Sequence, residues 1–265
     1  MQNRSLRLCG LTLILGIFGA FLRWVQTIRV FDPNTGLATP NSIWSYAVIF
    51  IILLSIALIF LRVRSLKKYI FPASYPEVFS RSTSVYTIFA IVIGIVMAVG
   101  GLMTIVNAMS VKSSYSVFEL MLGFFSLLCA ICVSAFVLNA NKPEKRSSGT
   151  LSSTIIVVFL CFWLIAAYKY SASDPVIWHF APRLLAISAT ILAFYFIAGF
   201  VFGKPKALYS LFFSLLGAFL CILTLADSYP KGEQLIVIAF AAEMLLLSFA
   251  QLSNMSENGT ETKKE

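Results

Sequence analysis

The residue with the clearest chemical potential is Glu243, an acid in the middle of the otherwise apolar run from Leu235 to Leu252. It lies about nine residues from each end of that run, roughly 13 Å along a helix that rises 1.5 Å per residue. A charge at that depth in a bilayer costs on the order of 3 kcal/mol, so such an acid normally faces a bundle interior, a cavity or a partner. Desolvation also favours its protonated form. Two interpretations follow: Glu243 is part of an ion or solute pathway, or it is a neutral acid hydrogen-bonded across a helix interface.

A second candidate feature is a stripe of small, mostly polar residues in the run from Leu208 to Leu225. Its members follow alternating spacings of four and three, which places them on one face of a helix. They are Ser210, Ser214, Gly217, Cys221, Thr224 and Ser228. The stripe could line a wet pathway through Ser210, Ser214 and Thr224. Hydroxyls in membrane helices also bond their own backbone or a neighbouring helix, so helix packing is the competing interpretation.

Four more polar residues lie near the ends of apolar runs, at similar levels on different predicted helices. They are Arg23, Glu119, His179 and Arg183. If the helices that carry them are neighbours, these side chains form a small polar vestibule at the outer face.

Sequence motifs for known catalytic chemistry are missing. The single histidine, His179, excludes paired-histidine haem ligation and disfavours a histidine-built metal centre. No Walker loop, HExxH, GxSxG or kinase motif occurs. The sequence therefore predicts a protein that is not an enzyme and that holds no metal or cofactor.

The elements that must position these residues are eight long apolar runs. A helix needs about 20 apolar residues to cross a hydrocarbon core roughly 30 Å thick, and 59% of the 265 residues are hydrophobic while 12% are charged. The expected spans are 8–30, 43–61, 85–106, 117–138, 151–168, 184–202, 208–225 and 235–252. We therefore predict an all-α integral membrane protein, a bundle of eight transmembrane helices in a single domain over residues 1–252. Residues 253–265 are polar and charged, and we expect them to form a disordered cytoplasmic tail.

Basic residues orient the bundle, because cytoplasmic loops of membrane proteins carry an excess of Lys and Arg. Of the 20 basic residues, fourteen lie on the side of the two termini: Arg4, Arg7, Arg62, Arg64, Lys67, Lys68, Arg81, Lys142, Lys145, Arg146, Lys204, Lys206, Lys263 and Lys264. Both termini are thus predicted to be cytoplasmic. The formal charge of +9 is spread over these loops, which favours contact with anionic inner-leaflet lipids and argues against a nucleic-acid partner.

Two features of the loops are also informative. The inner loop from Arg62 to Ser84 contains Phe71-Pro72-Ala73-Ser74-Tyr75-Pro76 and is expected to be an extended or interfacial segment held against headgroups. Asp32-Pro33 follows the first span and Asp174-Pro175 follows the fifth. This suggests a weak repeat of four plus four spans, although Asp-Pro is also an ordinary turn signal that arises by coincidence.

Several short segments carry a resemblance to a protein family. They are Phe31-Asp32-Pro33-Asn34-Thr35-Gly36-Leu37, Ser173-Asp174-Pro175-Val176-Ile177, Ala198-Gly199-Phe200-Val201-Phe202-Gly203 and Leu225-Ala226-Asp227. Together they resemble uncharacterised eight-span bacterial inner-membrane proteins. The resemblance implies the number of spans and a bacterial cytoplasmic membrane, and it implies no activity.

Two classes of function fit these observations. A transporter for a small solute or an ion accounts for the compact bundle, the polar stripe and Glu243. An accessory or sensory membrane subunit, which docks on a partner membrane protein, accounts equally well for the missing motifs. The sequence favours the transporter slightly.

Overall fold

The protein is a bundle of long helices. The computed structural model describes residues 2–32, 37–81, 83–110, 116–141, 146–172, 174 and 176–257. Within these ranges, eight helices are long and apolar enough to cross a membrane. Apart from one pair of two-residue strands, the regular elements described there are helical. The chain is a multi-pass membrane protein, as predicted.

The long helices match the predicted spans in number and order. They are α1 (Gln2–Val30), α2 (Ile43–Arg64), α4 (Ser84–Ser110), α5 (Ser116–Ala140), α6 (Arg146–Ser171), α7 (Ile177–Val201), α8 (Ala207–Thr224) and α9 (Lys231–Ser253). The largest difference is at α7, which begins seven residues before the predicted Leu184. Its first turns contain His179, Pro182 and Arg183, which interrupt the apolar pattern. Pro182 is the sixth residue of α7 and has no N–H to donate to the Trp178 carbonyl oxygen four residues earlier. That oxygen accepts a hydrogen bond from Arg23 Nη2 instead.

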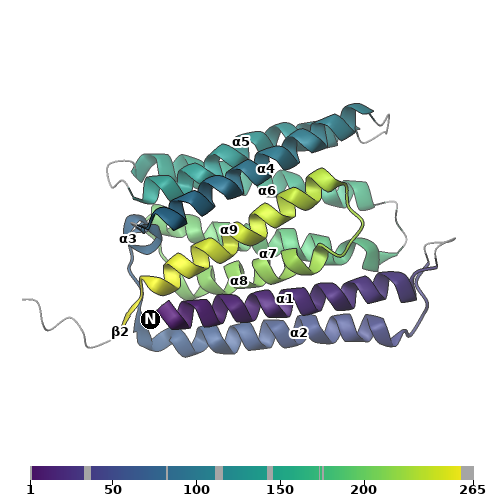
Figure 1. Ribbon diagram of the computed structural model, residues 1–265, viewed down its shortest axis with the longest axis horizontal. Helices are drawn as coiled ribbons and strands as arrows, with labels where there is room; N and C mark the ends of the chain where they lie inside the picture. The colour runs from purple at the N-terminus through teal and green to yellow at the C-terminus, as the bar shows by residue number, and fades with distance from the viewer. Residues whose placement is uncertain are drawn as a thin grey trace, which may run out of the picture.

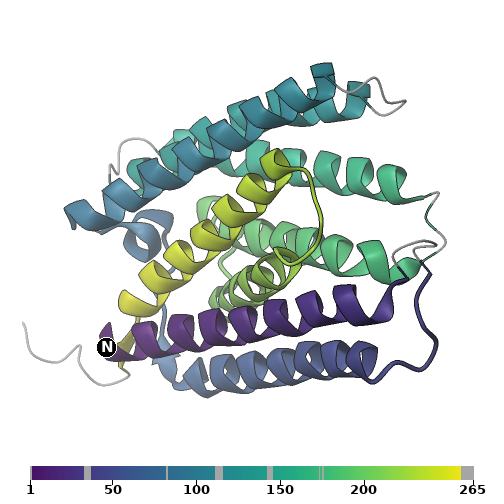
Figure 2. The same ribbon diagram turned by 45° about the vertical axis from the view of Figure 1, so that its right-hand side comes forward.

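The helices surround α9, which crosses the bundle obliquely. Figure 1 shows α4 and α5 on one side of α9 and α1 and α2 on the other, and Figure 2 shows the same arrangement. Helix α9 packs against α4, α8 and α1. The most hydrophobic windows of α8 and α9 are 72% and 67% buried, against 28% for those of α1 and α2. Helices α8 and α9 are therefore the most enclosed of these helices, although Tyr209 and Ile238 on them are exposed.

The outside of the bundle is apolar. Large side chains such as Ile14, Phe50 and Ile131 are exposed. Soluble proteins rarely expose apolar patches of this extent. These faces are the ones that contact the lipid bilayer.

Small residues allow α9 to approach α4 at its outer end. A Cβ added to Gly232 would lie 2.6 Å from the backbone nitrogen of Thr104 and 2.7 Å from the carbonyl oxygen of Gly100. Two other glycines make close contacts of the same kind: Gly94 of α4 lies against Ser134 of α5, and Gly16 of α1 lies against Ile222 of α8. Close backbone contact of this kind is the usual basis of helix association in lipid.

The inner loop enters the bundle, which corrects the expectation of an interfacial segment. After α2 the chain forms the short helix η1 (Ser65–Lys68), strand β1 (Tyr69–Ile70) and helix α3 (Tyr75–Phe79). Tyr75, Val78 and Phe79 are fully buried, and α3 contacts α5 and α9. Their three large apolar side chains are more stable in the core than at the headgroups.

The predicted disordered tail begins too early in the sequence, because residues 254–257 make defined contacts. Asn254 follows α9 and donates hydrogen bonds from Nδ2 to the carbonyl oxygens of Glu77, Val78 and Ser80, at 2.9 to 3.1 Å. Residues Ser256–Glu257 then form β2, which pairs antiparallel with β1. These contacts satisfy polar backbone groups of α3 and fix the chain through residue 257. Residues 258–265 lie outside the described part of the chain.

The cysteines are free. Cys129 and Cys132 are buried on α5, Cys221 is buried on α8, and Cys9 and Cys161 are less enclosed. The relation between the first four and last four spans stays a prediction, and Pro33 and Pro175 lie outside the described residues.

The orientation of the bundle gives a first testable prediction. The N-terminal end of α1 and the C-terminal end of α9 lie at the same end of the molecule (Figure 1). Because basic residues are concentrated at that end, reporter fusions after Ser147 and after Lys264 should report the cytoplasm. Fusions after Asn34 and after Lys231 should report the outer face. The opposite pattern in this fusion assay would reverse every assignment of inner and outer ends below.

Candidate functional site

The polar residues predicted at the outer face come together in the structure. Arg23 of α1 and His179 and Arg183 of α7 line one partly open cavity of about 340 Å³ at the predicted outer end. Asp174 also lines it, together with Asp227 and Tyr229 of the α8–α9 connection and Glu233 in the first turn of α9. We call this cavity the outer vestibule. Its volume lies at the lower end of the range typical of small-ligand sites.

Arg23 joins four parts of the bundle although it is almost fully buried. Its Nε donates to Asp227 Oδ1 at 2.6 Å, Nη1 to Gln26 Oε1 at 2.7 Å, and Nη2 to the Trp178 carbonyl oxygen at 2.7 Å. Gln26 in turn donates to Ser45 Oγ on α2 at 3.1 Å. Arg23 is 1% exposed, so its charge is compensated almost entirely by these partners. This one guanidinium group therefore links α1 to α7 and to the α8–α9 connection.

Arg183 forms a second buried pair on the other side of the vestibule. Its Nη2 donates to Glu233 Oε2, and its guanidinium carbon lies 4.6 Å from the centroid of the Tyr229 ring. Tyr229 donates from its hydroxyl to Asp227 Oδ2 at 2.9 Å, so the two arginine pairs are linked. The Nε of Arg183 is buried and has no hydrogen-bond partner among the described residues. An orphaned buried donor is costly, and an acceptor group on a ligand would satisfy it.

Burial shifts the acid–base behaviour of the vestibule. It raises the pKa of the Asp227 carboxyl, although Arg23 and the Tyr229 hydroxyl counteract that effect. Burial and the neighbouring Asp227 raise the pKa of Tyr229, so its hydroxyl keeps its proton as a hydrogen-bond donor. At the rim, burial opposes ionisation of Asp174, but the Val176 amide and the His179 ring lower its pKa. His179 Nδ1 lies 2.8 Å from Asp174 Oδ2.

Glu119 lies beside the vestibule. It lines a cavity of about 20 Å³ together with Arg183, Glu233, Lys169 and Trp163, and it interacts electrostatically with Glu233 and Arg183. A space of that size holds about one water molecule. The structure therefore places all four predicted vestibule residues around one connected set of charges.

Three members of this set were not selected from the sequence as site residues. Asp227 and Glu233 stand at the junctions of apolar runs, where charges are common, and Tyr229 lies between them. The available signal was their spacing: two acids within seven residues, at an outer end that also carries Arg23 and Arg183. Only tertiary contacts identify which arginine pairs with which acid.

Glu243 lies deeper, on the same helix as Glu233. It is 0% exposed, and neither carboxyl oxygen has a hydrogen-bond partner among the described residues. The hydroxyl of Tyr86 on α4 is also buried without a partner. Tyr86, Tyr75 of α3 and Cys129 of α5 lie in the neighbourhood of Glu243. The interpretation of Glu243 as an acid hydrogen-bonded across a helix interface therefore has no supporting contact.

Aromatic side chains separate Glu243 from the outer vestibule. Phe240 lies one helical turn before Glu243, with its ring centroid 5.9 to 6.0 Å from those of Phe159, Trp163 and Phe194. We call these four residues the outer aromatic cluster. Trp163 also lines the small cavity beside Glu119, so this cluster forms the floor of the polar region.

A second set of rings lies toward the inner end. Phe79 is 5.7 Å from Phe136 and 5.5 Å from Phe200 between ring centroids, and Tyr75 is 4.8 Å from Phe136. We call these four residues the inner aromatic cluster. Phe136 and Phe200 lie in the last turns of α5 and α7. Glu243 is therefore enclosed between two aromatic layers.

The stripe on α8 is buried against its neighbours. Ser210 donates to Gln251 Oε1 at 3.3 Å and Thr224 donates to the Cys221 carbonyl oxygen at 2.9 Å. Ser214 is buried without a partner among the described residues. Gly217 lies against Thr190 of α7. These contacts are those of a packing face. Of the stripe, Ser228, which follows α8, lines the outer vestibule.

No protein-family model, curated protein or solved structure matches this chain. Of the resemblance to eight-span inner-membrane proteins, the structure supports the number of spans. No family is identified. Within the described residues, no group of three His, Cys, Asp or Glu side chains is arranged to hold a metal ion. The function must therefore be argued from the site itself.

Proposed function

We propose that this protein transports a small polar solute or an ion across a bacterial cytoplasmic membrane, without catalysing a reaction. In this proposal the outer vestibule receives the solute, and Glu243 binds and releases the proton or cation that accompanies it. The single observation that carries the proposal is the environment of Glu243. It is fully buried near the middle of α9, and neither carboxyl oxygen has a partner within the described part of the chain.

A carboxyl without partners is an expensive feature in a membrane interior. An ionised acid there costs several kcal/mol, and an unmade hydrogen bond adds to this cost. Binding a proton or a cation removes the charge. If the position only had to be packed, an apolar residue would be more stable there than an acid. The neighbouring buried positions of the same helix hold such residues, namely Ala239, Phe240 and Met244.

The two aromatic clusters fit an occluded transporter. Alternating access requires that the central site be closed from both sides in at least one state. Helix α9 packs closely on α4 and α8, whereas it meets α6 and α7 through the ring of Phe240. A change of ring rotamers and a small shift of helices would open one side at a time.

The vestibule supplies both signs of charge for solute recognition. Arg23 and Arg183 face Asp227 and Glu233, and the orphaned Arg183 Nε offers one more donor. A solute with a carboxylate or another acceptor group suits this donor best. A small zwitterion or organic acid is therefore the first class of solute to test.

Purified protein in liposomes that contain a pH-sensitive dye provides the test. We expect an inward gradient of one of a panel of amino acids and organic acids to drive proton flux. Glu243→Gln should fold normally, because the amide keeps shape and hydrogen-bonding capacity, but it should abolish coupled proton flux. Glu77→Gln, the same change at an exposed carboxyl of α3, is the matched control and should transport normally.

Stability measurements separate coupling from packing. If Glu243 only fills space, Gln should leave flux unchanged and Glu243→Ala should mainly lower the thermal unfolding midpoint. Unchanged flux and pH response in a folded Glu243→Gln variant would contradict the coupling proposal. A stoichiometric partner that co-purifies with a flux-inactive protein would favour the accessory or sensory subunit instead.

A further inference from the structure

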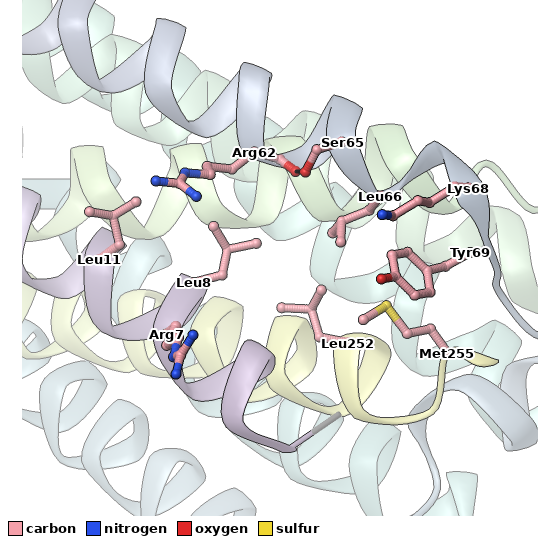
Figure 3. Close-up of a pocket in the computed structure, with 10 residues that line it drawn as sticks. All are labelled: Arg7, Leu8, Leu11, Arg62, Ser65, Leu66, Lys68, Tyr69, Leu252 and Met255. Carbon is pink, nitrogen blue, oxygen red and sulfur yellow. Dashed lines mark hydrogen bonds between the residues drawn. The ribbon is translucent and has the colours of Figure 1, made fainter. Parts of the chain in front are cut away.

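A second cavity lies at the opposite, inner end of the bundle. Its volume is about 530 Å³, and Figure 3 shows the ten residues that line it. They are Arg7, Leu8 and Leu11 of α1, Arg62 of α2, Ser65, Leu66 and Lys68 of η1, Tyr69 of β1, Leu252 of α9, and Met255. We call it the inner pocket. Residues of α2 and η1 stand on one side of it in Figure 3, and those of α1 and α9 stand on the other.

The polar part of the inner pocket is positively charged. Arg7, Arg62 and Lys68 come from three different elements, and their side chains are exposed. No acidic side chain is among the described residues that line the pocket. This contrasts with the outer vestibule, where Asp227 and Glu233 pair with the arginines. Three cations that line one pocket with no acid among its described lining residues favour an anionic ligand, above all a phosphate group.

The rest of the inner pocket is apolar. Leu8, Leu66, Leu252 and Met255 are buried and form its wall beneath the charged rim. On α1, Ile14 lies three residues after Leu11 and is exposed, so a lipid-facing part of α1 lies next to the pocket. A ligand that fits both parts carries a negative headgroup and an apolar chain.

Contacts far apart in the sequence hold this pocket in shape. The pairing of Tyr69 with Glu257 and of Ile70 with Ser256 fixes β1 to the end of the chain. This places Met255, which is 3% exposed, against Leu66 and Tyr69 in the pocket wall. The Lys68 ammonium lies 5.5 Å from the centroid of the Tyr69 ring, a distance at which the ring attracts a cation and orients it. The site is thus built before a ligand arrives.

We propose that the inner pocket binds the headgroup of one anionic phospholipid of the inner leaflet. Arg7, Arg62 and Lys68 bind its phosphate, and one acyl chain follows the apolar wall to the lipid-facing surface of α1. The proposal is independent of transport. Basic loops attract anionic lipids in general. The inner pocket would in addition bind one lipid per protein at a defined site.

Lipid titration of the full-length protein in detergent tests this proposal. Phosphatidylglycerol should raise the thermal unfolding midpoint with saturation at one lipid per protein, measured together with native mass spectrometry. Phosphatidylcholine should give no comparable shift. Arg62→Gln/Lys68→Gln should weaken phosphatidylglycerol binding by roughly tenfold or more, because each basic residue near an anionic surface contributes about a factor of five.

The inner surface provides a matched control. Arg64→Gln/Lys67→Gln removes the same charge from the same segment. Both residues are exposed, as Arg62 and Lys68 are, but neither lines the pocket. This variant should bind phosphatidylglycerol like the unmodified protein. Equal loss in both double variants would overturn the specific site, as would equal binding of phosphatidylcholine. Inorganic phosphate is the third probe: if it binds the pocket as tightly as phosphatidylglycerol does, the lipid assignment is wrong.

Discussion

Arg23→Ala should lower the free energy of unfolding by about 3–5 kcal/mol, the range seen when one member of a buried ion pair is removed. The substitution leaves Asp227 in a buried position without its closest cation, and it removes the donors to Gln26 and to the Trp178 carbonyl oxygen. Thermal or denaturant unfolding in a fixed detergent, followed by helical circular dichroism, measures the loss.

Two further variants make this measurement specific. Arg29→Ala removes the same charged group from an exposed position six residues later on α1, and surface changes of this kind are usually within 0.5 kcal/mol. The double variant Arg23→Met/Asp227→Leu replaces the pair by apolar groups and should recover much of the stability, since it leaves no unpaired charge. If Arg23→Ala costs no more than Arg29→Ala, the Arg23 network does not hold the outer end together.

The spans could be predicted because lipid imposes a simple rule on the sequence. A membrane helix must be apolar over about 20 residues, and that requirement is local. The prediction failed where local pattern and tertiary context differ. The start of α7 contains His179 and Arg183, which are stable within a helix only because Asp174 and Glu233 lie beside them.

The burial of α3 and its contacts with Asn254 could not be predicted for a similar reason. The segment from Tyr75 to Phe79 has only five residues, too few for a periodic signal, and its burial depends on α5, α7 and α9. Asn254 reads as an ordinary polar residue in a tail until its three hydrogen bonds to the α3 segment are known. Sequence alone gives polarity at each position, whereas the partner that satisfies a polar group is a property of the fold.

The candidate site was predicted in part. The prediction of Glu243 and the prediction of the outer vestibule rested on different kinds of evidence. Glu243 stands out locally, because an acid deep in an apolar run is rare. The vestibule depended on a condition that sequence could not test, namely that α1, α5 and α7 lie close enough at their outer ends. The aromatic clusters could not be predicted, since 24 phenylalanines are spread over the whole chain. Phe159, Phe194 and Phe240 are brought together by the packing of three helices, α6, α7 and α9.

Phe240→Ala tests whether the outer aromatic cluster closes the path to Glu243. Phe240 contacts three rings of that cluster and is 1% exposed. Its truncation removes a large side chain from the bundle centre, which should lower the free energy of unfolding by about 3–5 kcal/mol. The cavity also joins the vestibule, through the space beside Trp163, to the turn of α9 that carries Glu243. Water-soluble carbodiimide with an amine nucleophile, added to the outer side of sealed vesicles, should then label Glu243 several-fold faster than in the unmodified protein, as quantified by peptide mass spectrometry.

The matched control for this variant lies in the inner aromatic cluster. Phe136→Ala removes the same ring from a fully buried position near the inner end of α5, so its loss of stability should be similar. It leaves Phe159, Trp163, Phe194 and Phe240 in place, and labelling of Glu243 from the outer side should stay at the level of the unmodified protein. Labelling from the inner side should rise instead. If both variants accelerate labelling equally from the outer side, the reagent reaches Glu243 through general loosening of the bundle. If Phe240→Ala accelerates nothing, the outer aromatic cluster is not a barrier, and the route from the vestibule to Glu243 must be abandoned.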